Sequence, residues 1–265
     1  MWRMIGRVAV LGLGEAGSRY AADLVAAGVP VTGYDPVAAP ELAGLRLAAG
    51  PAEAVAGAGV VLSLTSARAA VPVARVAAPG LAAGAVYADL NTASPAGKQA
   101  VAAALAGTPA RFVDAAVLAP VSRAGLRTPL LLAGPGRDRL AGFLGQLGVP
   151  VEDAGETPGA AAGAKLLRSV FMKGLAAVIG EALEAAEAAG QQDWLRRQID
   201  AELAAAGPAL VTRLVEGTAR HAGRRADELA AVVEHLAQLG VRSQLSRATR
   251  DRLLELAEPA GKEQW

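Results

Sequence analysis

Short apolar runs alternate with alanine-rich segments of helical periodicity through the first part of the chain. The apolar runs occupy residues 7–12, 29–35, 59–65, 85–90, 111–118 and 128–134. Runs of this length that contain β-branched residues are typical of strands buried on both faces. Because such strands alternate here with helical segments, the pattern predicts an α/β fold with a doubly wound parallel sheet.

The pattern changes near residue 155, after which no strand signal remains. Residues 159–189 form one long stretch of helical periodicity that ends at Gly190, and the rest of the chain is also helical in pattern. We therefore expect two domains. An α/β domain covers residues 1–157, and an all-α domain covers residues 158–265 and begins with the long helix.

A glycine-rich loop follows the first apolar run and opens the first predicted helix. The loop consists of Gly12, Leu13, Gly14, Glu15, Ala16 and Gly17, in the pattern G-x-G-x-x-G. Between a strand and a helix, the first glycine permits a tight turn, the second lets the backbone approach a pyrophosphate, and the third lets helix and strand pack closely. The helix N-terminus also offers free N–H groups to phosphates. The loop therefore predicts a dinucleotide-binding domain; a plain βαβ unit with a glycine-rich turn is the alternative.

Asp35 ends the second predicted strand, 18 residues after Gly17. A carboxylate at this place can accept hydrogen bonds from the ribose hydroxyls of an adenosine. It would repel a 2′-phosphate, and the following residues PVAAP provide no arginine or lysine to receive one. Asp35 therefore favours NAD over NADP, while a simple turn cap before Pro36 is the alternative.

Four polar residues follow the predicted strands at their carboxyl ends, where doubly wound sheets bind ligands. These residues are Thr65, Ser66, Asn91 and Thr92. Each side chain could hydrogen-bond the ribose or the nicotinamide of the cofactor. Each is also compatible with ordinary turn chemistry.

Composition and charge exclude several other classes of function. The chain has 26 basic and 25 acidic residues, so its net charge of +1 gives no electrostatic basis for binding nucleic acid or an anionic membrane. Apolar stretches are interrupted well before the ~20 residues that a membrane-spanning helix needs. With no cysteine and two histidines, we expect no metal site. The absence of cysteine and of a signal peptide fits a cytoplasmic protein.

Lys165 stands in the apolar, alanine-rich first part of the long helix. Ser169 lies four residues on, which is the same helix face. A lysine beside a cofactor can donate a proton to a carbonyl oxygen or accept one from a hydroxyl. The alternative is a solvated helix face, because Lys165, Arg168, Ser169 and Lys173 share one broad arc.

The order of these parts resembles the β-hydroxyacid dehydrogenase superfamily, which includes 3-hydroxyisobutyrate and 6-phosphogluconate dehydrogenases. The matching segments are GLGEAG at 12–17, DLNTASP at 89–95, DAAV at 114–117 and GAAAGAK at 159–165. The resemblance implies that Lys165 is the catalytic acid or base and that Thr92 lies by the nicotinamide ribose. It also implies that Ser169 stands where the family usually has an asparagine.

The chain departs from this family at the place that usually binds the substrate carboxylate. The family commonly has Ser-Gly-Gly there, whereas this sequence has Leu118, Ala119 and Pro120. The usual binding site for the substrate carboxylate is therefore absent or formed by other residues. The segment 221–241 resembles a subfamily that carries a domain of unknown function, DUF1932. Within that segment Arg224 is a candidate for binding a substrate anion, and surface charge is the alternative.

Together these features predict an NAD(P)-dependent oxidoreductase that moves hydride between a nicotinamide and a small hydroxy acid or related alcohol or carbonyl compound. Two other functions stay open. One is an imine or ketone reductase of a biosynthetic pathway, against which the lysine at position 165 argues. The other is a non-catalytic NAD(P)-binding redox sensor. Since related enzymes usually dimerise through the helical domain, we also expect a homodimer.

Overall fold

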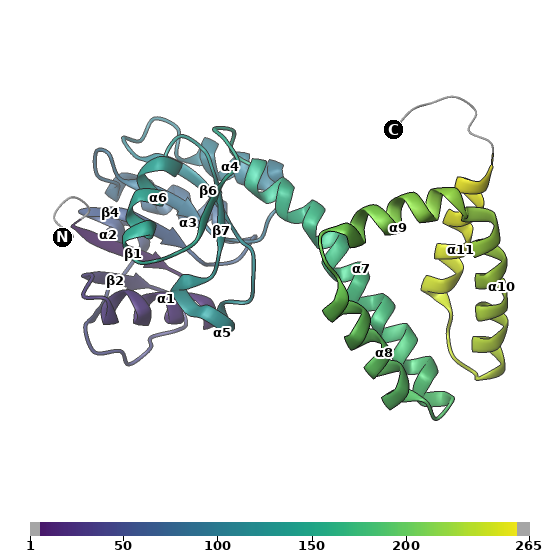
Figure 1. The fold of residues 1–265 in the computed structure, drawn as a ribbon. Coiled ribbons are helices and arrows are strands. Elements are labelled where there is room, and N and C mark those ends of the chain that lie inside the picture. Colours follow the sequence, from purple (N-terminus) through teal and green to yellow (C-terminus); the bar gives the residue numbers. More distant parts are fainter. Residues whose placement is uncertain (1–5, 259–265) are drawn as a thin grey trace. The chain divides into compact units, whose positions relative to one another are not determined.

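The computed structural model describes residues 6–258, and the chain divides into two compact units (Figure 1). The first unit covers residues 1–168 and the second covers residues 169–265. The sequence placed the domain boundary after residue 157, at the start of the long helix. The compact units divide within that helix, and its first turns, up to residue 168, are grouped with the N-terminal unit.

The N-terminal unit is built on one eight-stranded sheet with the order β3-β2-β1-β4-β5-β6-β7-β8. The strands are β1 (Arg7–Leu11), β2 (Val31–Tyr34), β3 (Leu45–Leu47), β4 (Ala58–Ser63), β5 (Val86–Asp89), β6 (Arg111–Val117), β7 (Leu130–Ala133) and β8 (Val151–Asp153). All six predicted strands are present, which confirms the α/β fold. The three-residue edge strands β3 and β8 were not predicted, because three residues are too few to show a periodicity.

One strand pair corrects the expectation of a purely parallel sheet. β7 runs antiparallel to β6, while every other neighbouring pair is parallel. The connection from β6 to β7 contains only the four-residue helix α5 (Val121–Ala124) and a single 3₁₀ turn, Gly125–Arg127. A parallel return requires a crossover that usually contains a full helix. This short connection therefore returns the chain in the opposite direction.

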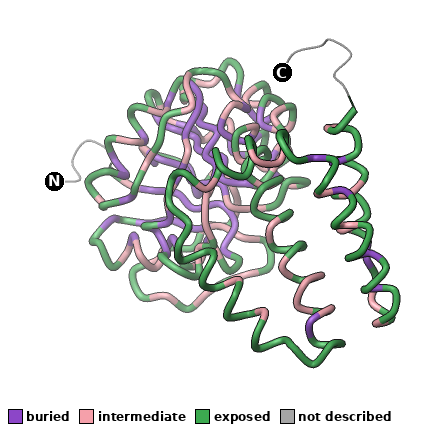
Figure 2. The backbone as a smooth tube through the Cα atoms, turned by 45° about the vertical axis from the view of Figure 1, so that its right-hand side comes forward, coloured by how far each residue is buried: buried purple, intermediate pink, exposed green. Residues whose placement is uncertain are grey.

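Helices cover both faces of the sheet and explain its fully apolar strands. On one face α1 (Glu15–Ala26) and α6 (Arg137–Gln146) pack with the core residues Val8 and Val10. On the other face α2 (Pro51–Val55), α3 (Ala70–Ala77) and α4 (Pro95–Ala104) pack with Ala9 and Leu11. Buried positions, drawn in purple, gather in the interior of the N-terminal unit (Figure 2). The central strand β1 therefore needs apolar side chains at successive positions.

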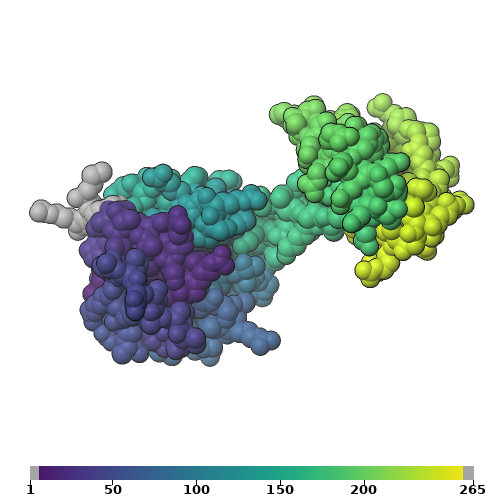
Figure 3. Space-filling model, turned by 90° about the horizontal axis from the view of Figure 1, so that it is seen from below, coloured from purple at the N-terminus to yellow at the C-terminus, as the bar shows by residue number. Residues whose placement is uncertain are grey.

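The C-terminal part of the chain is helical throughout its described residues, as the sequence predicted. The helices are α7 (Ala160–Ala188), α8 (Gln192–Ala205), α9 (Ala209–Arg220), α10 (Ala222–Gln238) and α11 (Gln244–Ala257). In Figure 3 the surface of this part is green and yellow. α10 and α11 pack through a small core that includes Ala222, Ala226 and Leu253. Among the described helices, none is long and apolar enough to cross a membrane.

Glu181 of α7 holds the start of α11. Its carboxylate accepts hydrogen bonds from the backbone N–H groups of Leu245 and Ser246, both at 2.8 Å, and from Ser246 Oγ at 2.6 Å. Burial raises the pKa of Glu181, but these hydrogen bonds outweigh it and leave the pKa below its ordinary value. The ionised carboxylate therefore caps the N-terminus of α11, where the helix dipole favours negative charge.

Candidate cofactor site and active site

Two of the three loop glycines are required by the fold itself. Gly12 has φ +90°, and a Cβ there would lie 2.4 Å from the carbonyl oxygen of Leu64. A Cβ on Gly17, in the first turn of α1, would lie 1.8 Å from the carbonyl oxygen of Gly12. No other residue fits at either position without moving the backbone. The loop is therefore the close strand–turn–helix junction that the sequence predicted.

Gly14 differs from the other two glycines because a side chain at this position would have free space around it. It is the N-cap of α1 with φ −64° and ψ −166°, a conformation open to any residue, and a Cβ there would meet no atom within 4 Å. The fold does not need a glycine at this position. The free space lies at a helix N-terminus, which is where a phosphate would be accommodated.

A hollow of about 450 Å³ opens in front of the glycine loop. Its lining residues are Gly12, Gly14, Tyr34, Asp35, Pro36, Pro51, Leu64, Thr65, Ser66, Ala69, Pro72, Val73 and Val76. The hollow brings together five of the predicted cofactor residues, from three different strand ends. None of the described residues that line it is a lysine, arginine or histidine.

The carboxylate of Asp35 joins the end of β2 to the glycine loop. Its Oδ2 accepts a hydrogen bond from the backbone N–H of Leu13 at 2.8 Å, and its Oδ1 accepts from Val37 and Ala38 at 2.8 Å each. Partial burial raises the pKa of Asp35, but these three bonds outweigh it, so the pKa lies below its ordinary value. Asp35 thus caps the turn after Pro36 and keeps a lone pair on Oδ2 that can accept a ligand hydroxyl.

Thr65 and Ser66 follow β4, one residue after its end, and lie in the turn that leads to α3. Ser66 Oγ accepts a hydrogen bond from the backbone N–H of Ala69 at 3.2 Å. The Thr65 hydroxyl donates to the carbonyl oxygen of Ser66 at 3.4 Å. Both residues line the hollow. Each therefore has a turn role already, and its predicted contact with the cofactor stays a prediction.

Lys165 and Thr92 meet although 73 residues separate them in the sequence. Lys165 Nζ donates a hydrogen bond to Thr92 Oγ1 at 3.1 Å. Thr92 follows β5, and Lys165 lies in the first part of α7, half-buried. Ser169 lies one turn farther along α7. Since β1, β4 and β5 are neighbours, the pair and the glycine loop lie at the same edge of the sheet.

Lys98 is a buried ion-pair residue that sequence reasoning missed. Its side chain is 1% exposed, and its Nζ lies 2.9 Å from Asp89 Oδ2 and 3.4 Å from Asp114 Oδ1. The two acids are paired in register on the adjacent strands β5 and β6. Two acidic residues in neighbouring buried strands require a counter-charge. This requirement is the signal by which the sequence could have indicated a buried lysine.

Asn91 braces the same strand ends. Its amide Nδ2 donates hydrogen bonds to Asp89 Oδ1 and, at 3.3 Å, to Ser63 Oγ. The residue is 7% exposed. Its amide hydrogens are therefore used inside the protein, and a direct role toward the cofactor stays a prediction.

The segment Leu118, Ala119 and Pro120 offers few hydrogen-bond donors. It forms the turn between β6 and α5, and the backbone N–H of Leu118 is bonded to the carbonyl oxygen of Pro129 at 2.9 Å. Proline has no N–H, and all three side chains are apolar. A substrate carboxylate would find little to bind at this turn.

The candidate arginine of the helical unit has a local partner. Arg224 is ion-paired with Glu228 one turn on along α10, and both side chains are exposed. The neighbouring Arg225 donates from Nη1 to Thr218 Oγ1 at 2.6 Å. The predicted substrate contact of Arg224 stays a prediction.

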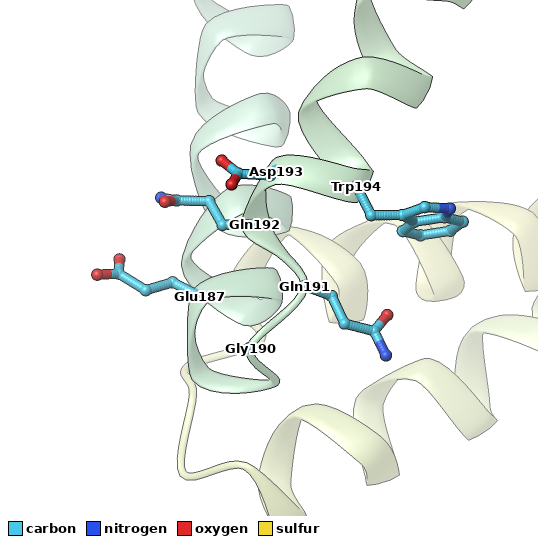
Figure 4. A pocket seen from close by; sticks show the side chains of 6 residues that line it. All are labelled: Glu187, Gly190, Gln191, Gln192, Asp193 and Trp194. Carbon is cyan, nitrogen blue, oxygen red and sulfur yellow. The ribbon is translucent and has the colours of Figure 1, made fainter.

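A second hollow, of about 640 Å³, lies at the turn between α7 and α8, and the predicted site residues do not line it. Its side chains diverge: Glu187, Gln192 and Asp193 point to one side, whereas Gln191 and Trp194 point to the other (Figure 4). Groups that do not converge cannot hold one small ligand. The candidate site is therefore the hollow at the sheet edge.

Two families match most of the chain. Residues 7–138 match the family described as the NAD binding domain of 6-phosphogluconate dehydrogenase. Residues 186–256 match the family described as a domain of unknown function, DUF1932. The first match contains the glycine loop, Asp35 and Thr92, and the second contains Arg224.

Two relatives have no stated activity. A conserved hypothetical protein from Sinorhizobium meliloti is 32% identical, with a TM-score of 0.62, over 98% of this chain and 92% of that chain. An uncharacterized 28.5 kDa protein from the 7S RNA 5′ region of Methanothermus fervidus is 25% identical over 173 residues, which are 65% of this chain and 66% of that protein. This chain thus matches just under two thirds of the curated relative's length.

Two more distant solved structures share the fold. The imine reductase of Streptomyces aurantiacus is 22% identical, with a TM-score of 0.81, over 94% of this chain and 93% of that chain. The imine reductase of Myxococcus stipitatus, solved with NADP+, is 17% identical, with a TM-score of 0.79, over the same shares of the two chains. At these identities the likeness concerns the fold.

Proposed function

Because this chain belongs to the β-hydroxyacid dehydrogenase superfamily, in the branch with a DUF1932 domain, we propose that it transfers hydride between NAD and a small hydroxy acid or related alcohol or carbonyl compound. The observation that carries the proposal is the hydrogen bond from Lys165 to Thr92. It supplies an acid–base group at the sheet edge where the glycine loop also lies.

The residues at this edge fit a dinucleotide. The open space at Gly14 and the N-terminus of α1 suit the pyrophosphate, because backbone N–H groups point there with the positive end of the helix dipole. The lone pair on Asp35 Oδ2 suits a ribose hydroxyl, and the apolar residues Ala69, Pro72 and Val73 suit a flat base. When bound, the nicotinamide would supply the hydride chemistry.

Lys165 is the proton-handling group of the proposed reaction. In the oxidative direction its neutral Nζ takes the proton of the substrate hydroxyl, and in the reductive direction its ammonium gives that proton to the carbonyl oxygen. Thr92 fixes the direction of Nζ through its hydroxyl oxygen. Ser169 lies one turn on and is proposed to help orient the substrate.

The cofactor preference can be measured by titrating the protein with NADH and with NADPH, following nicotinamide fluorescence. We expect NADH to bind at least about tenfold more tightly, which is ~1.4 kcal/mol. The reason is that the ionised Asp35 repels a 2′-phosphate and no described cationic side chain lines the hollow to receive one. Asp35→Asn keeps an acceptor for the N–H groups of Val37 and Ala38 but removes the negative charge. It should therefore reduce the difference in affinity between NADH and NADPH. Tighter binding of NADPH would contradict the argument from Asp35.

A second candidate function is reduction of an imine or ketone. It is favoured by the apolar turn Leu118–Ala119–Pro120, which offers little to a carboxylate. Turnover of neutral imines, with none of hydroxy acids, would select it over the first function. Cofactor binding without turnover of either class would select a redox sensor instead.

We also propose that the protein is a cytoplasmic homodimer. Large apolar side chains are exposed on the helical unit, where most of the tube is green (Figure 2), and among them are Val170, Phe171, Val211 and Val215. Exposed apolar surface of this kind is covered by a partner in related enzymes, and a second copy is the simplest partner. Light scattering at micromolar concentration should give twice the chain mass of 26.6 kDa. A monomer at that concentration would contradict this proposal.

A further inference from the structure

We infer that Lys98 is a positioning residue: it holds Thr92 and Lys165 at hydrogen-bond distance from one another. It does so through Asp89 on one side and Asp114 on the other. The consequence for turnover rests on the proposed function, whereas the structural coupling between Lys98 and Lys165 does not.

The ammonium group of Lys98 lies among three buried oxygen atoms. Nζ donates a hydrogen bond to the carbonyl oxygen of Asp89 at 2.6 Å, and it forms ion pairs with Asp89 Oδ2 at 2.9 Å and with Asp114 Oδ1 at 3.4 Å. With its side chain 1% exposed, Lys98 cannot reach a ligand. Its role must therefore act through the two carboxylates.

One cation faces two buried carboxylates, and the start of α7 compensates the second charge. Asp89 and Asp114 are both 0% exposed and paired in register. Asp114 Oδ2 accepts hydrogen bonds from the backbone N–H groups of Gly159 at 3.1 Å and Ala162 at 2.9 Å. N–H groups at the start of a helix have no partner within the helix, and they lie at the positive end of its dipole. The position of α7 is thereby tied to the position of Asp114.

The first path from Lys98 leads to Thr92. Asp89 Oδ1 accepts hydrogen bonds from the backbone N–H of Asn91 at 3.3 Å and from the Asn91 side chain. These bonds fix the turn that follows β5. Thr92 is the residue after Asn91, so the position of its hydroxyl group depends on the conformation of this turn.

The second path leads to Lys165. Lys165 lies one helical turn after Ala162, whose N–H is bonded to Asp114. The start of the helix has little freedom to move, since a Cβ on Gly159 would lie 2.9 Å from the carbonyl oxygen of Pro95. Both partners of the Lys165–Thr92 hydrogen bond thus depend on one buried cluster of Lys98, Asp89 and Asp114.

Removing the cation should loosen both paths at once. In Lys98→Met two adjacent carboxylates would lie buried without a cation, and their mutual repulsion would push them apart. A displaced Asp114 would hold the Gly159 and Ala162 amides less firmly. Lys165 would then lose its fixed distance to Thr92.

The coupling can be tested by NMR on protein labelled with ¹³Cε-lysine, because the chain has four lysines: Lys98, Lys165, Lys173 and Lys262. In Lys98→Met we expect the Lys165 signal to move, while the Lys173 signal, two turns farther along α7, stays in place. The matched control is Val101→Ala, a loss of buried volume on the same helix α4, which should leave the Lys165 signal unchanged. An unchanged Lys165 signal in folded Lys98→Met would overturn the inference.

A milder variant covers the case in which Lys98→Met does not fold. Asp114→Asn leaves one cation with one carboxylate but weakens the acceptor for the α7 amides. It should also move the Lys165 signal and speed amide hydrogen exchange at Ala162. No change in either would overturn the inference as well.

Kinetics with a substrate found by screening then separates this inference from the proposed function. Lys98→Met should lower kcat by about 100-fold, as expected for a misplaced catalytic group, with NADH affinity within about twofold. In a Lys165→Ala background it should cause no further loss, because the two changes act on one interaction. If the Lys165 signal moves in Lys98→Met but Lys165→Ala keeps its turnover, the proposed function is wrong and the inference stands. If the signal does not move but Lys165→Ala is inactive, the inference is wrong and the proposed function stands.

Discussion

Lys165→Ala is expected to lower turnover by about 10²–10⁴-fold, the usual contribution of a positioned acid or base. NADH affinity should change by no more than about twofold, because the groups proposed to bind the phosphates and the adenosine ribose belong to the glycine loop and to Asp35. The measurement is steady-state kinetics beside a fluorescence titration of NADH. The two readouts separate proton transfer from cofactor binding.

The matched control for this prediction is Lys173→Ala. Lys173 lies on the same helix but carries no proposed role in catalysis, so its loss should leave turnover near that of the unchanged protein. If Lys165→Ala retained turnover within a few fold, Lys165 would be a solvated helix residue and the acid–base assignment would be wrong.

Gly14→Val is expected to lower NADH affinity by at least about tenfold while leaving the thermal midpoint of unfolding nearly unchanged. The backbone of Gly14 is in a conformation that valine accepts, and a Cβ there meets no atom within 4 Å. The added side chain would instead occupy the space at the N-terminus of α1 that suits a pyrophosphate. Titration and thermal unfolding on the same sample test both halves of this expectation.

Gly17→Ala provides the contrast within the same loop. Its Cβ would lie 1.8 Å from the carbonyl oxygen of Gly12, so the backbone must shift. We expect a loss of stability of at least ~1–3 kcal/mol, as for other overpacked sites. Were Gly14→Val to bind NADH as tightly as the unchanged protein, the loop would be a structural turn rather than a phosphate site.

The three glycines of the loop differ in the reason why each position holds a glycine. The spacing G-x-G-x-x-G assigns one reason to each glycine, and the structure gives Gly12 and Gly17 a steric reason within the fold itself. For Gly14 the fold gives none. A glycine with no structural requirement, at a helix N-terminus, is the feature that a bound phosphate would explain.

The sequence by itself determined the features that depend on neighbouring residues. Continuous apolar runs predicted six strands, because a strand covered on both faces buries successive side chains, and a period of 3.6 residues predicted the long helix α7. The glycine loop and Asp35 were found because their spacing along one strand–turn–helix–strand unit is fixed by local geometry.

The tertiary structure decided what depends on residues far apart in the chain. The antiparallel direction of β7 is set in its pairing with β6, and the Lys98 cluster follows from the in-register pairing of Asp89 with Asp114. The Lys165–Thr92 bond joins residues 73 positions apart. Periodicity acts over one turn or one pleat, whereas these contacts are set by strand order and register, which no local pattern records.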